Sequence, residues 1–149
     1  MKRTLLIILC YTGIAFQTTA QDYPVIAKEY CDCFAKLKDS MEVEFQKILM
    51  KVAADSNVRS AFETELNAMS ADKRMRFATQ LEFIGNSMES GDNEAGKCGA
   101  KLDLKYKEYN DTSEKEKVFN SKMIAELNKK SECKFLASIV TFALAFSDE

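Results

Sequence analysis

Hydrophobic residues recur at helical intervals between residues 26 and 52. Each lies three or four positions from the next, which places them on one face of an α-helix. Asp22 and Pro24 stand before the first of them, where an acidic residue and a proline favour the start of a helix. The pattern predicts a helix that continues through Asp39-Ser40 or breaks briefly there. Its apolar face consists of Ile26, Tyr30, Cys33, Leu37, Met41, Phe45, Ile48 and Val52.

Two shorter sets of apolar residues at helical spacing, here called stripes, predict two further helices. Ser56 and Ser70 precede them, and serine is a preferred helix N-cap because its hydroxyl accepts a hydrogen bond from a first-turn backbone amide. Residues 89–96, which include Gly91 and Gly96, are predicted to form a loop. The two stripes consist of Val58, Phe62, Leu66 and Met69, and of Met75, Ala78, Leu81, Ile84 and Met88.

A turn separates two helical segments in the C-terminal part of the chain. Residues 110–113 are predicted to form this turn, and Ser113 with Glu116 matches the capping box that opens a helix. We expect one helix or a pair of helices to follow. The segment before the turn has one helical face, made of Cys98, Leu102, Tyr106 and Tyr109.

Residues 135–146 form an uncharged run of twelve residues. The run is too short to cross a bilayer, which takes about 20 residues. A helix that is apolar all round belongs inside a bundle, so we expect this one to be central. The alternative is a helix that stays partly exposed and forms a dimer or partner interface.

Helix breakers are scarce, since the chain contains one proline and five glycines among 149 residues. Together with the stripes, this composition predicts an all-α fold, a compact bundle of about five helices. Residues 21–149 are expected to form a single domain stapled by disulfides. A chain of this length can bury roughly two-thirds of its unfolded surface.

The N-terminal segment has the three parts of a secretory signal peptide. Lys2 and Arg3 precede an uncharged stretch, and Ala20, with the small Thr18 two positions earlier, matches a signal peptidase site. We therefore expect residues 1–20 to be removed and the mature chain to begin at Gln21. Its location would be periplasmic or extracellular, with no transmembrane anchor in the mature chain.

Four cysteines remain after this cleavage: Cys31, Cys33, Cys98 and Cys133. An even number of cysteines in an exported chain predicts two disulfides. Residues two apart on a helix point roughly 200° away from each other, so Cys31 and Cys33 should each bond to Cys98 or Cys133, in either order. A redox motif would space its cysteines by two residues rather than one. Thiolate metal binding stays as an alternative.

The sequence contains no histidine. This excludes Ser-His and Cys-His nucleophile pairs, an imidazole general base, and His-ligated zinc or haem. The 23 acidic residues show no spacing that singles out a catalytic pair. We therefore predict no enzyme, no catalytic residue and no resident cofactor or metal site.

The mature chain is mildly acidic. Removal of residues 1–20 takes away two of the 21 lysines and arginines and none of the 23 acidic residues, which leaves a formal charge of −4. Nucleic acids and anionic lipids are bound by concentrated basic faces. The charge therefore argues against nucleic acid as a partner.

Tyr30, Tyr106 and Tyr109 are candidates for a binding edge at one end of the bundle. In the alternative, their rings pack beside the disulfides and their hydroxyls face water. We expect an exported, non-enzymatic helical domain that binds an unknown partner. Another possibility is a carrier of a small apolar ligand, with a cavity of roughly 300 Å³ or more. That cavity would be lined by Phe45, Phe62, Phe77, Phe83, Phe119, Phe135, Phe142 and Phe146.

Overall fold

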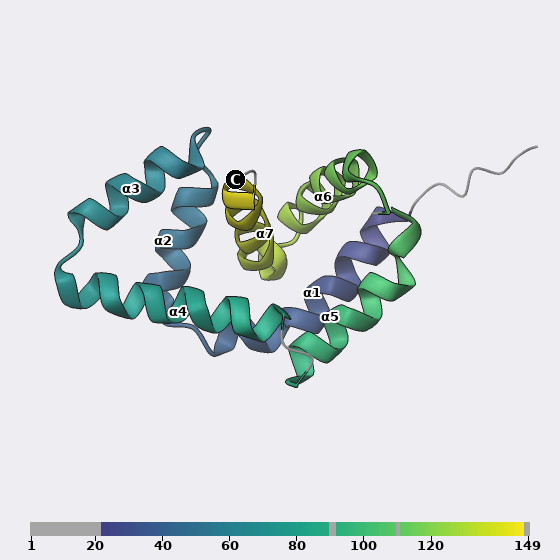
Figure 1. Ribbon diagram of the computed structural model, residues 1–149, viewed down its shortest axis with the longest axis horizontal. Coiled ribbons are helices and arrows are strands. Elements are labelled where there is room, and N and C mark those ends of the chain that lie inside the picture. The colour runs from purple at the N-terminus through teal and green to yellow at the C-terminus, as the bar shows by residue number, and fades with distance from the viewer. Residues whose placement is uncertain (1–21, 90–91, 110, 148–149) are drawn as a thin grey trace, which may run out of the picture.

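The computed structural model describes residues 22–89, 92–109 and 111–147 (Figure 1). These ranges hold seven α-helices, two short 3-10 helices and no strand, so the predicted all-α class is confirmed, with more helices than the five expected. The predicted signal peptide, residues 1–20, lies outside the described residues. The elements are α1 (Tyr23–Asp39), α2 (Val43–Ala53), α3 (Val58–Ala68), α4 (Ala71–Glu89), α5 (Glu94–Lys105), η1 (Lys107–Tyr109), α6 (Ser113–Asn128), η2 (Ser131–Cys133) and α7 (Lys134–Ser147).

Two of the predicted helical segments are divided in the structure. The first breaks between α1 and α2, where the sequence allowed a break. The side-chain amide of Gln46 bridges this break, because it donates hydrogen bonds to the carbonyl oxygens of Lys38 at 2.9 Å and Met41 at 3.1 Å. The last segment divides into α6 and α7 at η2, which ends with Cys133.

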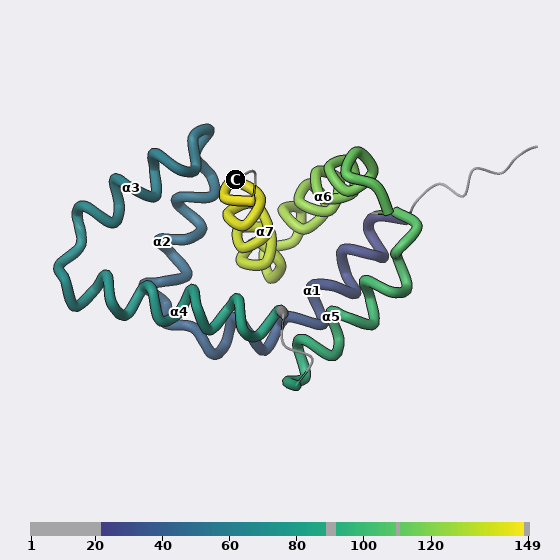
Figure 2. Tube along the Cα trace, in the orientation of Figure 1, coloured from purple at the N-terminus to yellow at the C-terminus, as the bar shows by residue number. Residues whose placement is uncertain are grey.

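Helix α7 lies in the middle of the bundle, between α2 and α6 (Figures 1 and 2). Residues 135–139 are buried, which confirms the central position predicted for the N-terminal half of the uncharged run. The C-terminal half is less covered, and Phe146 keeps 38 % of its surface exposed. Of the helices in the described ranges, none combines the length and the apolar character that a membrane span requires.

Two disulfides hold α1 from opposite sides. Cys31 bonds to Cys133 in η2, with 5.5 Å between their Cα atoms, and Cys33 bonds to Cys98 in α5, with 5.8 Å between theirs. This confirms that the neighbouring pair on α1 bonds outward to two different partners. The sequence left two ways of pairing the four cysteines, and the structure has Cys31 with Cys133 and Cys33 with Cys98.

Two predicted helix caps are wrong by one residue. Asn57, and not Ser56, caps α3, since its side chain accepts a hydrogen bond from a first-turn amide at 3.1 Å. Thr112, and not Ser113, caps α6 in the same way. Both positions offer adjacent residues of cap-forming type, so residue type alone could not choose between them. Ser70 accepts the corresponding bond at the start of α4, as predicted.

Helix α5 begins inside the segment predicted to be a loop. Its first residue is Glu94, and the side chain of Asn93 accepts a hydrogen bond from the Gly96 amide at 2.7 Å. Asparagine is a strong N-cap, which explains why the helix starts before the glycine. The predicted loop at 89–96 is therefore too long at its C-terminal end.

The buried face of α4 differs from the predicted stripe. Met75 is 69 % exposed and Ala78 is also exposed, whereas Phe77 is only 4 % exposed. The Phe77 ring packs on Phe45 of α2, with 4.6 Å between ring centroids. This aromatic partner, which lies far away in sequence, decides which side of α4 faces inward. The members of the stripe that do pack against the core are Leu81, Ile84 and Met88.

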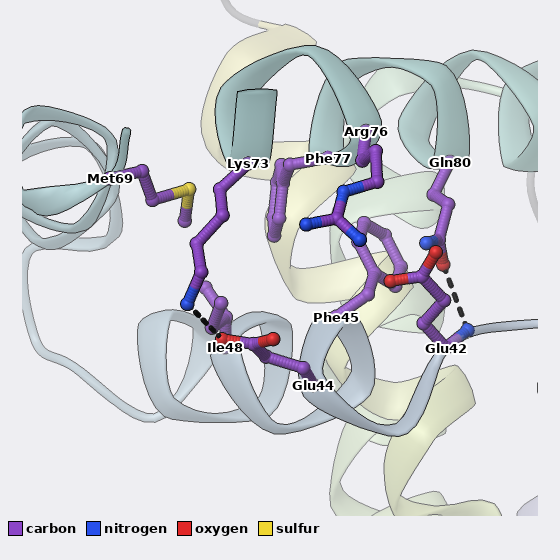
Figure 3. A pocket seen from close by; sticks show the side chains of 9 residues that line it. All are labelled: Glu42, Glu44, Phe45, Ile48, Met69, Lys73, Arg76, Phe77 and Gln80. Atoms are coloured by element: carbon purple, nitrogen blue, oxygen red, sulfur yellow. Dashed lines mark hydrogen bonds and ion pairs between the residues drawn. The ribbon is translucent and has the colours of Figure 1, made fainter. Parts of the chain in front are cut away.

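Polar side chains close over this aromatic contact between α2 and α4 (Figure 3). Lys73 Nζ lies 2.9 Å from a carboxylate oxygen of Glu44, and the side-chain oxygen of Gln80 accepts a hydrogen bond from the Glu42 backbone amide at 3.0 Å. Glu42 is the N-cap residue of α2, so α4 supplies an acceptor for a helix-start amide of α2. The remaining cavity of about 30 Å³ has room for about one water. These residues therefore clamp two helices together and leave no space for a ligand.

Candidate functional site

The three tyrosines of the predicted binding edge lie together: Tyr30 is in the first half of α1, Tyr106 directly follows α5 and Tyr109 ends η1. Helix α1 begins and α5 ends on the same side of the bundle (Figure 1). The ring centroids of Tyr30 and Tyr106 are 6.3 Å apart, and those of Tyr106 and Tyr109 are 6.0 Å apart. Phe119 of α6 contacts both outer rings, with centroids 6.4 Å from Tyr30 and 6.3 Å from Tyr109. We call these three tyrosines and Phe119 the tyrosine cluster.

Two hydroxyls of the tyrosine cluster donate to carboxylates. The Tyr30 hydroxyl donates to Asp103 Oδ1 at 2.7 Å, and the Tyr106 hydroxyl donates to Glu29 Oε2 at 2.9 Å. Burial raises the pKa of Tyr30, and the hydrogen bond to Asp103 raises it further. Tyr30 therefore stays protonated at neutral pH and remains a hydrogen-bond donor. The three rings pack against the hydrophobic core, and two of the hydroxyls, which the alternative interpretation placed in water, have carboxylate partners.

Glu29 joins the cluster to Lys105, whose Nζ lies 2.7 Å from the Glu29 carboxylate. The hydrogen bonds from Lys105 and then from Tyr106 lower the pKa of Glu29. A carboxyl whose folded pKa is lowered contributes stability above its unfolded pKa of about 4.3. That contribution is lost as the pH falls through the folded pKa.

We expect Glu29→Gln to lower the free energy of unfolding at pH 7 by less than about 1 kcal/mol, because the ion pair is partly exposed. The difference from the parent protein should shrink as the pH falls below about 4. Thermal unfolding midpoints measured between pH 7 and pH 2 test this. Glu82→Gln, the same change at an exposed residue of α4, is the matched control. A difference that stays constant or grows in acid would contradict the assignment.

An open hollow of about 310 Å³ adjoins the tyrosine cluster beside α6. Its apolar floor includes Val118, which is 49 % exposed, and the Tyr23 ring, whose centroid is 6.1 Å from that of Phe119. An aromatic and aliphatic floor with a polar rim is typical of protein interfaces. We call this surface the tyrosine edge, and it is formed by Tyr23, Tyr109, Thr112, Glu114, Lys115 and Val118.

A second, more enclosed pocket of about 130 Å³ lies among α1, α4, α5, α6 and α7. We call it the central pocket. Gly99 lets α5 approach α1 here, since a Cβ atom at this position would lie 3.0 Å from Phe34 Cζ. The polar side chains that line it are Tyr30, Asp103 and Asn120. The apolar lining consists of Phe34, Met88, Phe119, Met123, Leu127, Leu136 and Val140.

The central pocket is smaller than the cavity expected of a carrier. Its 130 Å³ is close to the roughly 150 Å³ of an engineered apolar cavity that binds benzene, so it has room for one ring-sized group. Larger hollows of about 260 to 310 Å³ are more open to solvent. Of the eight phenylalanines expected to line a carrier cavity, only Phe119 lines this pocket. Others pack ring against ring, as Phe62 and Phe142 do with centroids 4.9 Å apart.

Glu29, Gly99 and Asp103 were not among the predicted site residues. The signal that would have found them is the pairing of Cys33 with Cys98, because it makes α1 and α5 antiparallel neighbours. Tyr30, three residues before Cys33, then lies beside Asp103, five residues after Cys98, and donates a hydrogen bond to it. The same register places Glu29 beside the end of α5.

The four predicted cysteines have a structural role in the described part of the chain. Cys31, Cys33, Cys98 and Cys133 are all in disulfides. Cysteine binds metal as a thiolate, and a cysteine in a disulfide has no thiolate. Within the described ranges, no three His, Cys, Asp or Glu side chains are grouped so that they could hold a metal ion.

The chain matches no model of a known protein family, no curated protein and no solved structure. Its function is therefore inferred from the chemistry and geometry of the tyrosine cluster, the tyrosine edge and the central pocket.

Proposed function

We propose that the chain is an exported, non-enzymatic helical domain that binds a protein partner through the tyrosine edge. The observation that carries the proposal is an open hollow, lined by Tyr23, Tyr109 and the exposed Val118, directly beside the tyrosine cluster. Tyrosine is enriched in protein interfaces, because its ring offers a large apolar area and its hydroxyl a hydrogen bond.

Export is supported by the two disulfides together with the signal-like N-terminal sequence. Disulfides form and persist in oxidising compartments and are rare in the cytosol. The protein would work in a periplasm or outside the cell, where such bridges keep the helices of a small domain in place.

The other functional hypotheses have less support. Thiolate metal binding requires free cysteine sulfurs, but the four cysteines predicted for the mature chain are all bonded in the two disulfides. A carrier of larger apolar molecules requires more enclosed volume than the central pocket supplies. For catalysis, the sequence provides no histidine, and the raised pKa of Tyr30 makes its hydroxyl a poor nucleophile at neutral pH.

Site-specific photocrosslinking in an exporting host tests the proposed interface. A photoreactive phenylalanine analogue replaces Val118 on the tyrosine edge, and in a matched variant it replaces Val43, which is 64 % exposed at the start of α2. We expect a distinct protein adduct from position 118 and none of the same mass from position 43. Tyr109→Ser in the first chain should reduce the yield of this adduct.

Thermal unfolding of the Tyr109→Ser chain separates loss of the interface from loss of the fold. Adducts of equal mass from both positions would indicate nonspecific contact and contradict the proposal. The same conclusion would follow if position 118 gave no adduct while the analogue remained photoreactive toward a bystander protein added in excess.

A further inference from the structure

We propose that the central pocket binds a small organic cation, an amine that carries a single ring or a short branched alkyl group. The apolar walls and the volume select the hydrocarbon part of this ligand, and the carboxylate of Asp103 selects its charge. This inference goes beyond the partner-binding function, and the two do not depend on each other.

The apolar part of the pocket matches one ring in size and character. Apolar side chains from α1, α4, α6 and α7, together with α5, enclose a volume of about 130 Å³. Phe34 stands against Gly99, so a Cβ atom at position 99 would lie 3.0 Å from Phe34 Cζ and the ring would have to shift slightly. A ring bound here gains apolar contacts with these walls and loses its exposure to water, which favours binding.

The polar side of the pocket carries a negative charge without a cationic partner. No lysine or arginine of the described residues forms an ion pair with Asp103 or lines the pocket. Tyr30 donates to Asp103 Oδ1, which leaves Oδ2 for a ligand. Asp103 is exposed, so this side of the pocket reaches the surface.

The aromatic side chains add a second reason to prefer a cation. Tyr30 and Phe119 line the pocket together with Asp103. An ammonium group near the face of an aromatic ring is attracted by the electron density of that face. A carboxylate ligand would instead meet the like charge of Asp103, and a neutral ligand could donate a hydrogen bond to Asp103 but would lack the attraction between opposite charges.

Three probes of similar size and different charge test the proposal: benzylamine, benzyl alcohol and benzoate. Each is titrated into the ¹⁵N-labelled full chain at pH 7, where benzylamine is a cation and benzoate an anion. We expect benzylamine to shift the Gly99 and Val140 amide resonances and to bind about fivefold more tightly than benzyl alcohol, the gain of a partly exposed ion pair. Benzoate should bind most weakly.

Asp103→Asn removes the charge at the rim but keeps an oxygen that accepts the Tyr30 hydrogen bond. It should bring the affinities for benzylamine and benzyl alcohol to within about twofold of each other. Asp39→Asn, at an exposed position in α1, removes the same charge elsewhere and should leave the preference unchanged.

Equal affinities of the parent chain for the amine and the alcohol would overturn the cation preference. The absence of shifts at Gly99 and Val140 with all three probes would overturn the pocket itself. Neither result bears on the tyrosine edge, because the photocrosslinking at Val118 reports on a separate surface.

Discussion

Removal of the Cys31–Cys133 disulfide, by replacement of both cysteines with alanine, is expected to lower the free energy of unfolding by about 4 to 5 kcal/mol. The bridge joins residues 102 positions apart, so its loss releases a long loop in the unfolded chain. It also joins α1 to the start of the central helix α7, and Cys31 and Cys133 are only 7 % and 2 % exposed. A loss of this size is a large part of the free energy of unfolding of a typical domain, which is about 5 to 15 kcal/mol.

Urea unfolding of the parent and of the double-alanine variants measures this effect. The Cys33–Cys98 bridge spans 65 positions, and its removal should cost about 4 kcal/mol. The chain without either bridge should therefore be largely unfolded at 37 °C. Intact mass before and after reduction is the control, since the parent should gain four hydrogens and each double variant two. A four-alanine chain that unfolds at the midpoint of the parent would refute the stabilising role.

The cysteine pairing shows how much follows from helical geometry alone. Two residues two apart on a helix face different sides, so it was predictable that Cys31 and Cys33 would bond to partners on different elements. Which partner lies on which side depends on where α5 and α7 dock against α1. That placement results from packing across the whole bundle, and the cysteine spacing contains no information about it.

The face that α4 buries was mispredicted for a related reason. Apolar residues occupy much of its circumference, so a spacing of three or four positions fits more than one stripe. The choice between Met75 and Phe77 depends on the Phe45 ring of α2, which is distant in sequence. The predicted face of α1 is only partly right for the same reason, since Ile26 and Leu37 are buried and Tyr30 and Cys33 are half-buried. Cys31 and Phe34, which lie outside the predicted face, are also buried.

For the candidate site, residue type was more informative than position. Tyrosines are few, so Tyr30, Tyr106 and Tyr109 could be singled out, and the α1–α5 disulfide brings their helices together. Asp103 and Glu29 are two of 23 acidic residues and carry no distinguishing mark in the sequence. The central pocket is the space left over by side chains from several helices, so no local pattern encodes its volume.

Phe77→Ala is expected to lower the free energy of unfolding by about 3 to 5 kcal/mol, the range for a buried phenylalanine. The Phe77 ring is 4 % exposed and packs on Phe45 and on Phe62 of α3, whose centroid is 6.0 Å away. Met75→Ala is the matched control on the same helix. Met75 is 69 % exposed, so its substitution should change stability by no more than about 0.5 kcal/mol.

Hydrogen exchange shows whether Phe77→Ala loosens the whole bundle or one part of it. Helix α3 has no fully buried side chain, and its Phe62 ring contacts Phe77 of α4 as well as Phe142 and Phe146 of α7. The Phe77 ring is therefore one of a few contacts that attach α3 and the first half of α4 to the bundle. Neither disulfide involves these helices, whereas both hold α1. We therefore expect Phe77→Ala to reduce amide protection in α3 and α4 well before α1 and α5 are affected. A larger effect from Met75→Ala, or uniform loss of protection across all helices, would show that the Phe45–Phe77 contact does not anchor this part of the fold.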